Sequence, residues 1–180
     1  MEVKKQYVYI GIATGIVALG VGIFLARKKI YQHFDYKTDY LLLSLEPKFR
    51  KKVKKLLANA RKEGIELRVT SAERNCEEQN KLYAKGRTAP GKVVTNAKCG
   101  KSSHNYKLAV DVVEFKNGKA LWTNSNWDRI GQLGEAVGLE WGGNWRSFKD
   151  KPHFQDLGGT TLASLYNEYQ ETGNDPSTLV

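Results

Sequence analysis

Apolar residues that recur with a period near 3.6 residues predict several helices along this chain, and a glycine follows most of these helices. The first begins at Pro47, where proline suits an initial turn, and ends at Gly64. We interpret its lysine-rich face as solvated, with contact to an anionic partner as the alternative. Its apolar face holds Phe49, Val53, Leu56, Leu57 and Ala60, its lysines are Lys48, Lys51, Lys52, Lys54 and Lys55, and the other predicted helices cover 77–85, 127–137 and 161–171.

Alternation with a period of two predicts strands over 65–71 and 108–115. Asn117-Gly118 predicts a tight turn that returns the chain as a partner strand over 119–122. Residues 139–155 carry turns and one short extended piece, and 27–45 are expected to be a connector. Because helices and a hairpin mix without regular alternation, the predicted class is α+β, a small antiparallel sheet with flanking helices.

Residues 7–26 are uncharged and apolar, which predicts a single transmembrane helix before the folded domain. About 20 residues rise about 30 Å as a helix, enough to span a bilayer. The alternatives are a cleaved signal peptide and a buried core helix. Two lysines precede the segment and three basic residues follow it, so charge alone leaves its orientation open. The predicted organisation is an anchor and connector over 1–33, a domain over 34–172 and a flexible tail over 173–180.

Composition narrows the possible partners without choosing one. An apolar fraction of 41% supports a buried core, and a net charge of +10 favours anionic partners. No base-reading helix or aromatic-rich RNA motif accompanies that charge, so no nucleic-acid partner is expected. The two cysteines, Cys76 and Cys99, lack metal-site spacing and are either two buried thiols or one disulfide.

Two of the three histidines lie near carboxylates in a pattern that is compatible with a metal site; the alternative, from the residues alone, is that they are ordinary polar residues. His104 precedes a predicted strand that carries Asp111, and His153 follows a proline; His33 is given no role. Two imidazoles and one carboxylate are a typical ligand set for catalytic zinc, which lowers the pKa of a bound water to about 7. Since a separation of seven residues would place the first two ligands on opposite faces of a straight strand, the chain must turn near 106–107. Asp150 is then a candidate proton acceptor beside the metal.

These residues resemble a family of zinc peptidases that includes bacterial D-alanyl-D-alanine carboxypeptidases and the L-alanyl-D-glutamate peptidases of phage endolysins and sporeformer wall hydrolases. The family pattern SxHxxGxAxD, followed downstream by D/E-x-x-H, is matched by Ser102, His104, Ala109, Asp111, Asp150 and His153. The resemblance covers nearly all of residues 41–156 and includes Arg74, Glu78, Gln79 and the stretch 138–145.

The resemblance implies a role for each matched residue. His104, Asp111 and His153 would bind Zn²⁺, and Asp150 would act as general base and then general acid. Arg74 would bind substrate and stabilise the oxyanion of the tetrahedral intermediate. Gln79 and Ser102 would shape the substrate cleft, and Trp141 and Trp145 are interpreted as core or cleft wall. A disulfide between Cys76 and Cys99, if formed, would tie the segment of Arg74 to the metal loop.

Two positions depart from the family pattern. Lys107 stands where the family has glycine; if the backbone there needs a positive φ, lysine costs roughly 1 kcal/mol or more. Residues 71–74 differ from the family's usual Gly-aromatic-Arg sequence, which puts the substrate pocket in question. Neither change removes a proposed ligand or the proposed base.

The resemblance implies hydrolysis of an amide bond in the peptide stems of peptidoglycan, with the L-alanyl-D-glutamate bond favoured. The alternatives are a D,D-carboxypeptidase and a zinc-loaded binding module that has lost catalysis through Lys107. Because peptidoglycan lies outside the cytoplasmic membrane, the domain is expected to face the periplasm or cell wall from a single-pass anchor. We also expect the protein to act as a monomer.

Overall fold

The computed structural model describes residues 35–123 and 125–180. The predicted anchor at 7–26 and His33 lie outside the described residues. Within the described part of the chain, no helix has the length and apolar character needed to cross a bilayer. Residues Lys37–Val180 form one compact unit.

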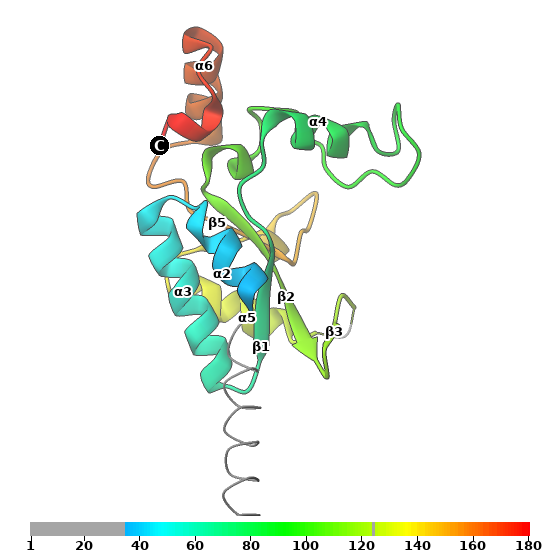
Figure 1. Ribbon diagram of the computed structural model, residues 1–180, viewed down its shortest axis with the longest axis vertical. Coiled ribbons are helices and arrows are strands. Elements are labelled where there is room, and N and C mark those ends of the chain that lie inside the picture. The colour runs from blue at the N-terminus through cyan, green and yellow to red at the C-terminus, as the bar shows by residue number, and fades with distance from the viewer. Residues whose placement is uncertain (1–34, 124) are drawn as a thin grey trace, which may run out of the picture. The chain divides into compact units, whose positions relative to one another are not determined.

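The fold class is α+β, as predicted, and its centre is a five-stranded antiparallel sheet (Figure 1). The strand order is β1-β2-β5-β4, and β3 pairs with β2. The described strands are β1 (Glu66–Ser71), β2 (Ala109–Lys116), β3 (Lys119–Ala120), β4 (Glu140–Trp141) and β5 (His153–Gln155). The α-helices are α2 (Tyr36–Leu43), α3 (Pro47–Lys62), α4 (Cys76–Ala84), α5 (Trp127–Glu135) and α6 (Leu162–Thr172), and the 3₁₀ helices are η1 (Ser103–Tyr106), η2 (Gly142–Asn144) and η3 (Pro176–Thr178).

One face of the sheet carries the hydrophobic core, against which α3 and α5 pack. Val53, Leu56 and Ala60 of α3 are fully buried there, as their helical spacing predicts. Helix α5 approaches β4 and β5 closely because it has glycine at 131 and 134. A Cβ at Gly131 would lie 2.3 Å from the Trp141 ring, and one at Gly134 would lie 2.2 Å from the Phe154 ring. The opposite face of β2 and β5 is therefore left to carry polar side chains.

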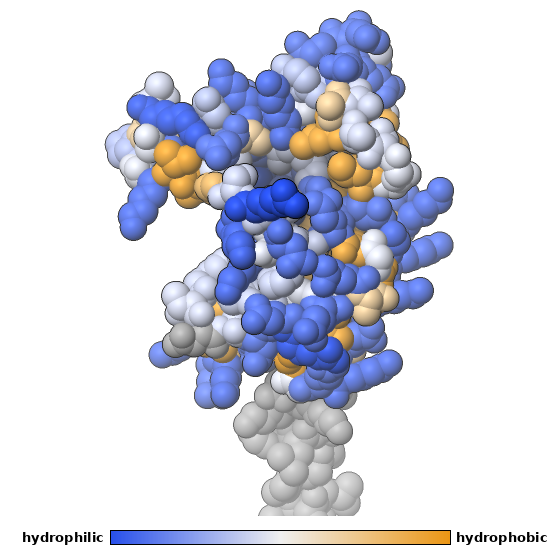
Figure 2. All heavy atoms as spheres, turned by 180° about the vertical axis from the view of Figure 1, so that it is seen from behind, coloured by the Kyte–Doolittle hydropathy of each residue, from blue (hydrophilic) through white to orange (hydrophobic). Residues whose placement is uncertain are grey.

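The lysine-rich face of α3 is only partly solvated. Most of its lysines are exposed, but Lys52 is half-buried and donates to Gly138 O at 3.1 Å and to Asp156 Oδ2 at 2.5 Å. Figure 2 shows the face of the molecule turned away from the viewer of Figure 1, where hydrophilic residues predominate and apolar residues form separate patches.

Two segments differ from the sequence expectation. The segment 27–45, expected to be a connector, contains α2. This helix buries Thr38, whose Oγ1 accepts a hydrogen bond from Val69 N at 2.9 Å along β1. The tail after Gly173, expected to be loose, contains η3 with Pro176 buried, and η3 contacts η1. In both segments, tertiary contacts outweigh a sequence pattern that is weak by itself.

Candidate metal centre

Strand pairing brings two of the predicted ligands together. Asp111 on β2 is the direct antiparallel partner of His153 on β5, so both side chains leave the same face of the sheet. Their neighbours Val110 and Phe154 are also direct partners and are fully buried in the core on the other face. The alternation of side chains along two strands thus separates the polar site from the core.

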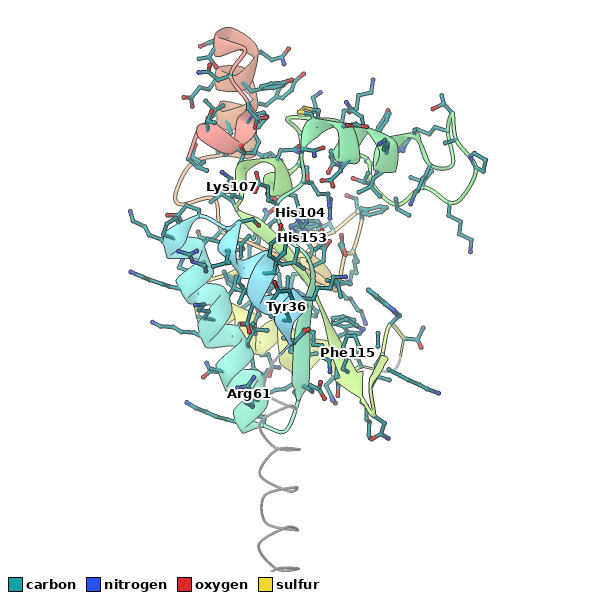
Figure 3. The ribbon with its side chains drawn as sticks, in the orientation of Figure 1. Tyr36, Arg61, His104, Lys107, Phe115 and His153 are labelled. Carbon is teal, nitrogen blue, oxygen red and sulfur yellow. A yellow bond between two sulfur atoms is a disulfide. The ribbon has the colours of Figure 1, made fainter. Side chains whose placement is uncertain are left out.

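A turn brings in the third ligand. His104 lies on η1, and the chain reverses at Lys107, whose backbone is left-handed with φ 60° and ψ 19°. The turn predicted near 106–107 is therefore present, and Lys107 occupies the positive-φ conformation that the family glycine suits. Figure 3 shows His104 and His153 close together in the fold, with Lys107 on the adjoining turn.

The two predicted histidine ligands flank one carboxylate oxygen of the third ligand, Asp111. Asp111 Oδ1 lies 3.3 Å from His104 Nε2 and 3.3 Å from His153 Nδ1. Among the described residues, these three form a group whose ligand atoms all lie within 4.8 Å of one another. Asp111 Oδ1 is also the one buried side-chain oxygen or nitrogen in the described part of the chain without a hydrogen-bond partner. A buried carboxylate oxygen needs a partner, and a zinc ion among these atoms supplies one.

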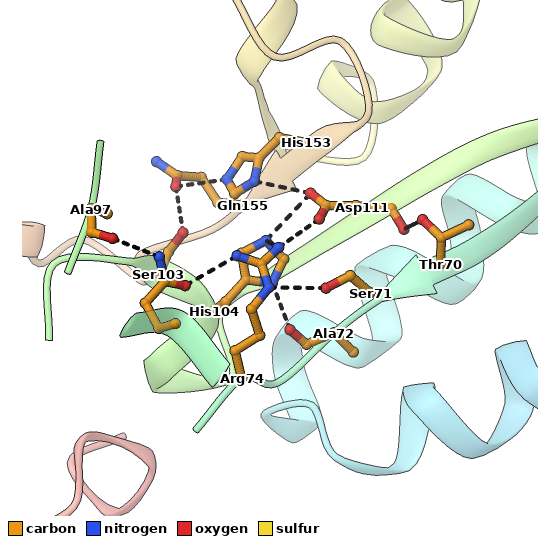
Figure 4. A network of polar contacts seen from close by, with 11 residues as sticks. Thr70, Ser71, Ala72, Arg74, Ala97, Ser103, His104, Asp111, His153 and Gln155 are labelled. Carbon is orange, nitrogen blue, oxygen red and sulfur yellow. Dashed lines mark hydrogen bonds and ion pairs between the residues drawn. The ribbon is translucent and has the colours of Figure 1, made fainter. Parts of the chain in front are cut away.

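The ring of His104 is set for metal binding. Its Nδ1 lies 2.5 Å from Ala72 O, which can only accept a hydrogen bond, so Nδ1 carries the proton and Nε2 presents its lone pair (Figure 4). Burial lowers the pKa of His104, which favours the neutral ring that a metal ligand requires. Burial alone would raise the pKa of Asp111, but His104 and His153 hold it well below its usual range. The site therefore presents an ionised carboxylate beside a neutral imidazole.

Arg74 lies against the same carboxylate. Its Nη2 donates to Asp111 Oδ2 at 2.7 Å and lies 3.1 Å from His104 Nε2, and its Nε donates to Ser71 Oγ at 3.2 Å (Figure 4). The Arg74 backbone is held by η1: its N–H donates to His104 O at 3.1 Å, and its C=O accepts from Asn105 Nδ2 at 2.8 Å. The guanidinium is thus fixed at the wall of the site rather than left on the surface.

Asp150 approaches from the turn before β5. It is half-buried, and burial raises its pKa, to which the nearby charge of Asp111 adds. Its backbone is anchored to η2, because Asp150 N–H donates to Gly142 O at 3.0 Å. A Cβ at residue 142 would lie 2.5 Å from Asp150 O, so only glycine fits there.

These groups open into a cleft of about 750 Å³. Arg74, Asp150 and the three candidate ligands line it together with Ser102, whose substrate-shaping role stays a prediction. Trp145 is part of the wall, and its ring centroid lies 4.9 Å from that of His153. Trp141 is buried in the core instead. Exposed apolar side chains at the cleft are Val94, Trp122 and Phe148.

The expected role of Gln79 needs correction. Gln79 is fully buried, and its side chain donates to Ala97 O at 2.8 Å and accepts from Arg74 Nη1 at 3.1 Å. It therefore supports the arginine from behind instead of contacting substrate. Cys76 and Cys99 are joined in a disulfide with Cα atoms 4.7 Å apart, between the α4 start and the loop before η1.

Sequence reasoning did not single out Gln155, Ser103 or Glu140, which form a polar network around His153. Gln155 Oε1 lies 3.1 Å from His153 Nε2 and accepts from Ser103 Oγ at 2.8 Å (Figure 4). Gln155 Nε2 donates to Glu140 Oε2 at 2.8 Å. Period-two spacing from His153 was a signal for Gln155, because residues two apart on a strand share a face. The pairing of Glu140 with Gln155 depends on strand register, which the sequence does not give.

An antiparallel α+β fold with a His-Asp-His group, a neighbouring carboxylate and a fixed arginine in one cleft defines a zinc-dependent hydrolase. A family model described as D-alanyl-D-alanine carboxypeptidase matches residues 95–156. Over 121 residues the chain is 36% identical to peptidoglycan L-alanyl-D-glutamate endopeptidase CwlK of Bacillus subtilis (strain 168), covering 62% of this chain and 72% of that protein. The chain belongs to this family of zinc peptidases, as the sequence resemblance predicted.

Solved structures share the fold. L-Ala D-Glu endopeptidase ChiX of Serratia marcescens matches with a TM-score of 0.50 and 20% identity, over 68% of this chain and 87% of that one. The vancomycin resistance D,D-pentapeptidase VanY, solved in complex with Zn(II), matches with a TM-score of 0.50 and 16% identity, over 75% of this chain and 83% of that one.

Proposed function

We propose that this chain hydrolyses the L-alanyl-D-glutamate bond in the stem peptides of peptidoglycan, with zinc held by His104, Asp111 and His153. The observation that carries the zinc site is Asp111 Oδ1, which is buried without a hydrogen-bond partner between two imidazole nitrogens. The bond is chosen because the relative that shares 36% identity is named for cleaving it.

Different residues around the cleft carry out metal binding, proton transfer and stabilisation of the oxyanion. Zinc held by the three ligands supplies Lewis-acid polarisation and lowers the pKa of a water to about 7. Asp150 accepts the proton of the attacking water and then donates it to the leaving amine. Arg74 donates hydrogen bonds to the oxygen of the scissile carbonyl as negative charge develops there. Since every group comes from one chain, the arrangement supports action as a monomer.

The D,D-carboxypeptidase alternative is supported by the description of the matching family model. The two activities differ in which stem bond lies against Arg74 and Asp150, and the cleft lining beyond those residues decides this. The impaired binding module is less well supported, because Lys107 already adopts the left-handed backbone and the ligands converge with lysine in place.

We also propose that residues 7–26 anchor the chain in the cytoplasmic membrane, with the domain facing the periplasm or cell wall. The support is the uncharged length of this segment and the location of peptidoglycan outside that membrane. A protease added to intact spheroplasts should digest the domain; a domain protected until the membrane is broken would contradict this orientation.

Mass spectrometry of purified peptidoglycan tests the activity. The full chain, 1–180 in detergent, is incubated with peptidoglycan, with and without a chelator, beside an Asp150→Asn variant. Chelator-sensitive fragments ending at L-alanine and beginning at D-glutamate would support the proposal. Release of terminal D-alanine alone would establish the carboxypeptidase instead. A folded, zinc-loaded protein that releases nothing would support the binding module.

A further inference from the structure

His153 offers its metal-facing lone pair through Nδ1, the opposite ring nitrogen from the one that His104 uses. His153 Nδ1 lies 3.3 Å from Asp111 Oδ1, while Nε2 faces Gln155 Oε1 at 3.1 Å. In a neutral imidazole, one nitrogen carries the proton and the other carries the lone pair. His153 can therefore bind a metal through Nδ1 only if its proton sits on Nε2. Something outside the ring must select that tautomer.

The Gln155 amide selects it only if its oxygen, and not its NH₂ group, faces His153. The shape of an amide does not distinguish its two ends, so the hydrogen-bond partners must decide. Gln155 Nε2 lies 2.8 Å from Glu140 Oε2, and a carboxylate can only accept. The NH₂ group therefore faces Glu140. The amide oxygen then accepts from both His153 Nε2 and Ser103 Oγ.

Glu140 is itself fixed as an acceptor. Its other oxygen, Oε1, accepts from Trp145 Nε1 at 2.6 Å, and an indole N–H can only donate. Glu140 is also the direct partner of Gln155 across the β4–β5 pair, so the two side chains share a face. Three hydrogen bonds thus run in series from Trp145 through Glu140 and Gln155 to His153. Trp145 can only donate and Glu140 can only accept, and these two residues fix the direction of every bond in the series.

We propose that Glu140 and Gln155 are positioning residues that hold His153 in its Nε2–H tautomer and so set the zinc affinity of the site. The inference rests on the zinc site proposed above and deepens it. Residues that bond a metal-binding histidine at its second nitrogen typically change metal affinity 10- to 100-fold when they are replaced. Both residues line the cleft, and in this role they act on the metal site through His153.

Exchanging the two residues provides the test. In Glu140→Gln, residue 140 has one acceptor oxygen for two donors, Trp145 and Gln155. One way to satisfy both is to flip the Gln155 amide, which then presents NH₂ to His153 and selects the wrong tautomer. In Gln155→Glu, two carboxylates face each other and one must move away.

The double variant Glu140→Gln/Gln155→Glu restores every donor and acceptor. The new amide at position 140 accepts from Trp145 through its oxygen and donates through its NH₂ group to the new carboxylate at position 155. That carboxylate accepts from His153 and Ser103, as the amide oxygen of Gln155 does in the unmodified chain. The double variant therefore selects the same His153 tautomer with the two side chains exchanged.

Zinc affinity is measured on the full chain in detergent by competition with a chromophoric chelator, and the visible spectrum of the Co²⁺-substituted protein is recorded alongside. We expect each single variant to bind zinc about 10-fold or more weakly and the double variant to recover most of the loss. Glu135→Gln is the matched control, because Glu135 accepts from Asn144 at 2.7 Å but does not reach His153. It should bind zinc like the unmodified chain.

The possible results distinguish a failure of the positioning role of Glu140 and Gln155 from a failure of the proposed zinc site itself. Single variants that bind zinc as tightly as the unmodified chain would overturn the tautomer role, and so would a double variant no better than the weaker single one. An unmodified chain that binds no zinc, or binds it equally with Asp111→Asn, would overturn the metal site itself. Melting of the metal-free variants identifies any that fail to fold, and the double variant then decides the question.

Discussion

Arg74 Nη2 donates a hydrogen bond to Asp111 Oδ2 across 2.7 Å, while the other oxygen of that carboxylate faces both candidate histidine ligands. The carboxylate is thereby divided between an arginine and a metal site. Because Gln79 holds Nη1 of the same guanidinium, the arginine is fixed in one orientation. Arg74 thus orients the candidate zinc ligand Asp111 and also lies in the cleft, where it can polarise the carbonyl oxygen of a substrate.

Replacing Arg74 should damage turnover more than folding. We expect Arg74→Lys to lower kcat about 100-fold, because a lysine keeps the charge but loses the paired donors that bind an oxyanion. The measurement is kcat and KM on a synthetic stem peptide, with zinc content determined on the same sample. Arg87→Lys is the control, since Arg87 bonds Tyr83 O and Thr95 O away from the ligands. Full activity in Arg74→Lys would contradict the oxyanion role.

Replacing Lys107 with glycine should stabilise the fold without a large gain in activity. The left-handed backbone costs a lysine roughly 1 kcal/mol, and glycine removes this cost. Part of the stabilisation is lost again because glycine has more conformational freedom in the unfolded chain. We therefore expect Lys107→Gly to raise the free energy of unfolding by up to about 1 kcal/mol, measured by urea denaturation. Lys107→Ala keeps the backbone strain, loses the 3.9 Å ion pair with Glu73 and should not be more stable. A large rise in kcat for Lys107→Gly would favour the impaired-module alternative.

The sequence predicted those parts of the site that depend on local rules. Period-two alternation placed Asp111 opposite the buried valines, and the odd spacing from His104 required the turn found at Lys107. Helix α2 was missed because it exposes Tyr36, Tyr40 and Leu43 and buries Thr38 beside Leu42, so its apolar residues do not gather on one buried face. The Glu140–Gln155 pair depends on strand register, a long-range property.

The ionised Asp150 carboxylate should lower the stability of the metal-free protein. Burial, with the charge of Asp111, raises its pKa, so ionising it at neutral pH costs more in the folded state than in the unfolded chain. Below the unfolded pKa of about 3.9 the carboxyl is protonated in both states and this cost is absent. The cost grows as pH rises from the unfolded pKa to the folded pKa, and it is complete above the folded pKa. We expect Asp150→Asn to abolish activity yet raise the melting temperature of the metal-free protein at pH 7, with a smaller gain at pH 4.

Carboxyl ¹³C NMR gives an independent check on Asp150, with the signal assigned by its absence in Asp150→Asn. The Asp150 carboxyl should titrate above about 3.9 in the metal-free protein. Added zinc should move this titration to lower pH, because a cation in the cleft favours the carboxylate. An unshifted titration in the metal-free protein would contradict the burial argument.

The Cys76–Cys99 disulfide should stabilise the fold and keep Arg74 near the metal loop. It closes a loop with a sequence separation of 23, for which chain-entropy estimates give roughly 3 kcal/mol. Cys76 starts α4 two residues after Arg74, and Cys99 lies shortly before Ser102 and the 3₁₀ helix η1, which carries His104. We expect the double variant Cys76→Ala/Cys99→Ala to lose about that much free energy of unfolding and to raise KM more than it lowers zinc content.

Thiol titration of the denatured, unreduced protein should find no free thiol, and reduction should release two. The control for lost packing is Cys99→Ser alone, which removes the bond but keeps a side chain of similar size beside Tyr169. Because either change opens the same loop, the single and double variants should unfold at similar urea concentrations. Equal thiol counts with and without reductant would show that the bond is not formed, and the cleft would then rely on the hydrogen bonds between Arg74 and η1 alone.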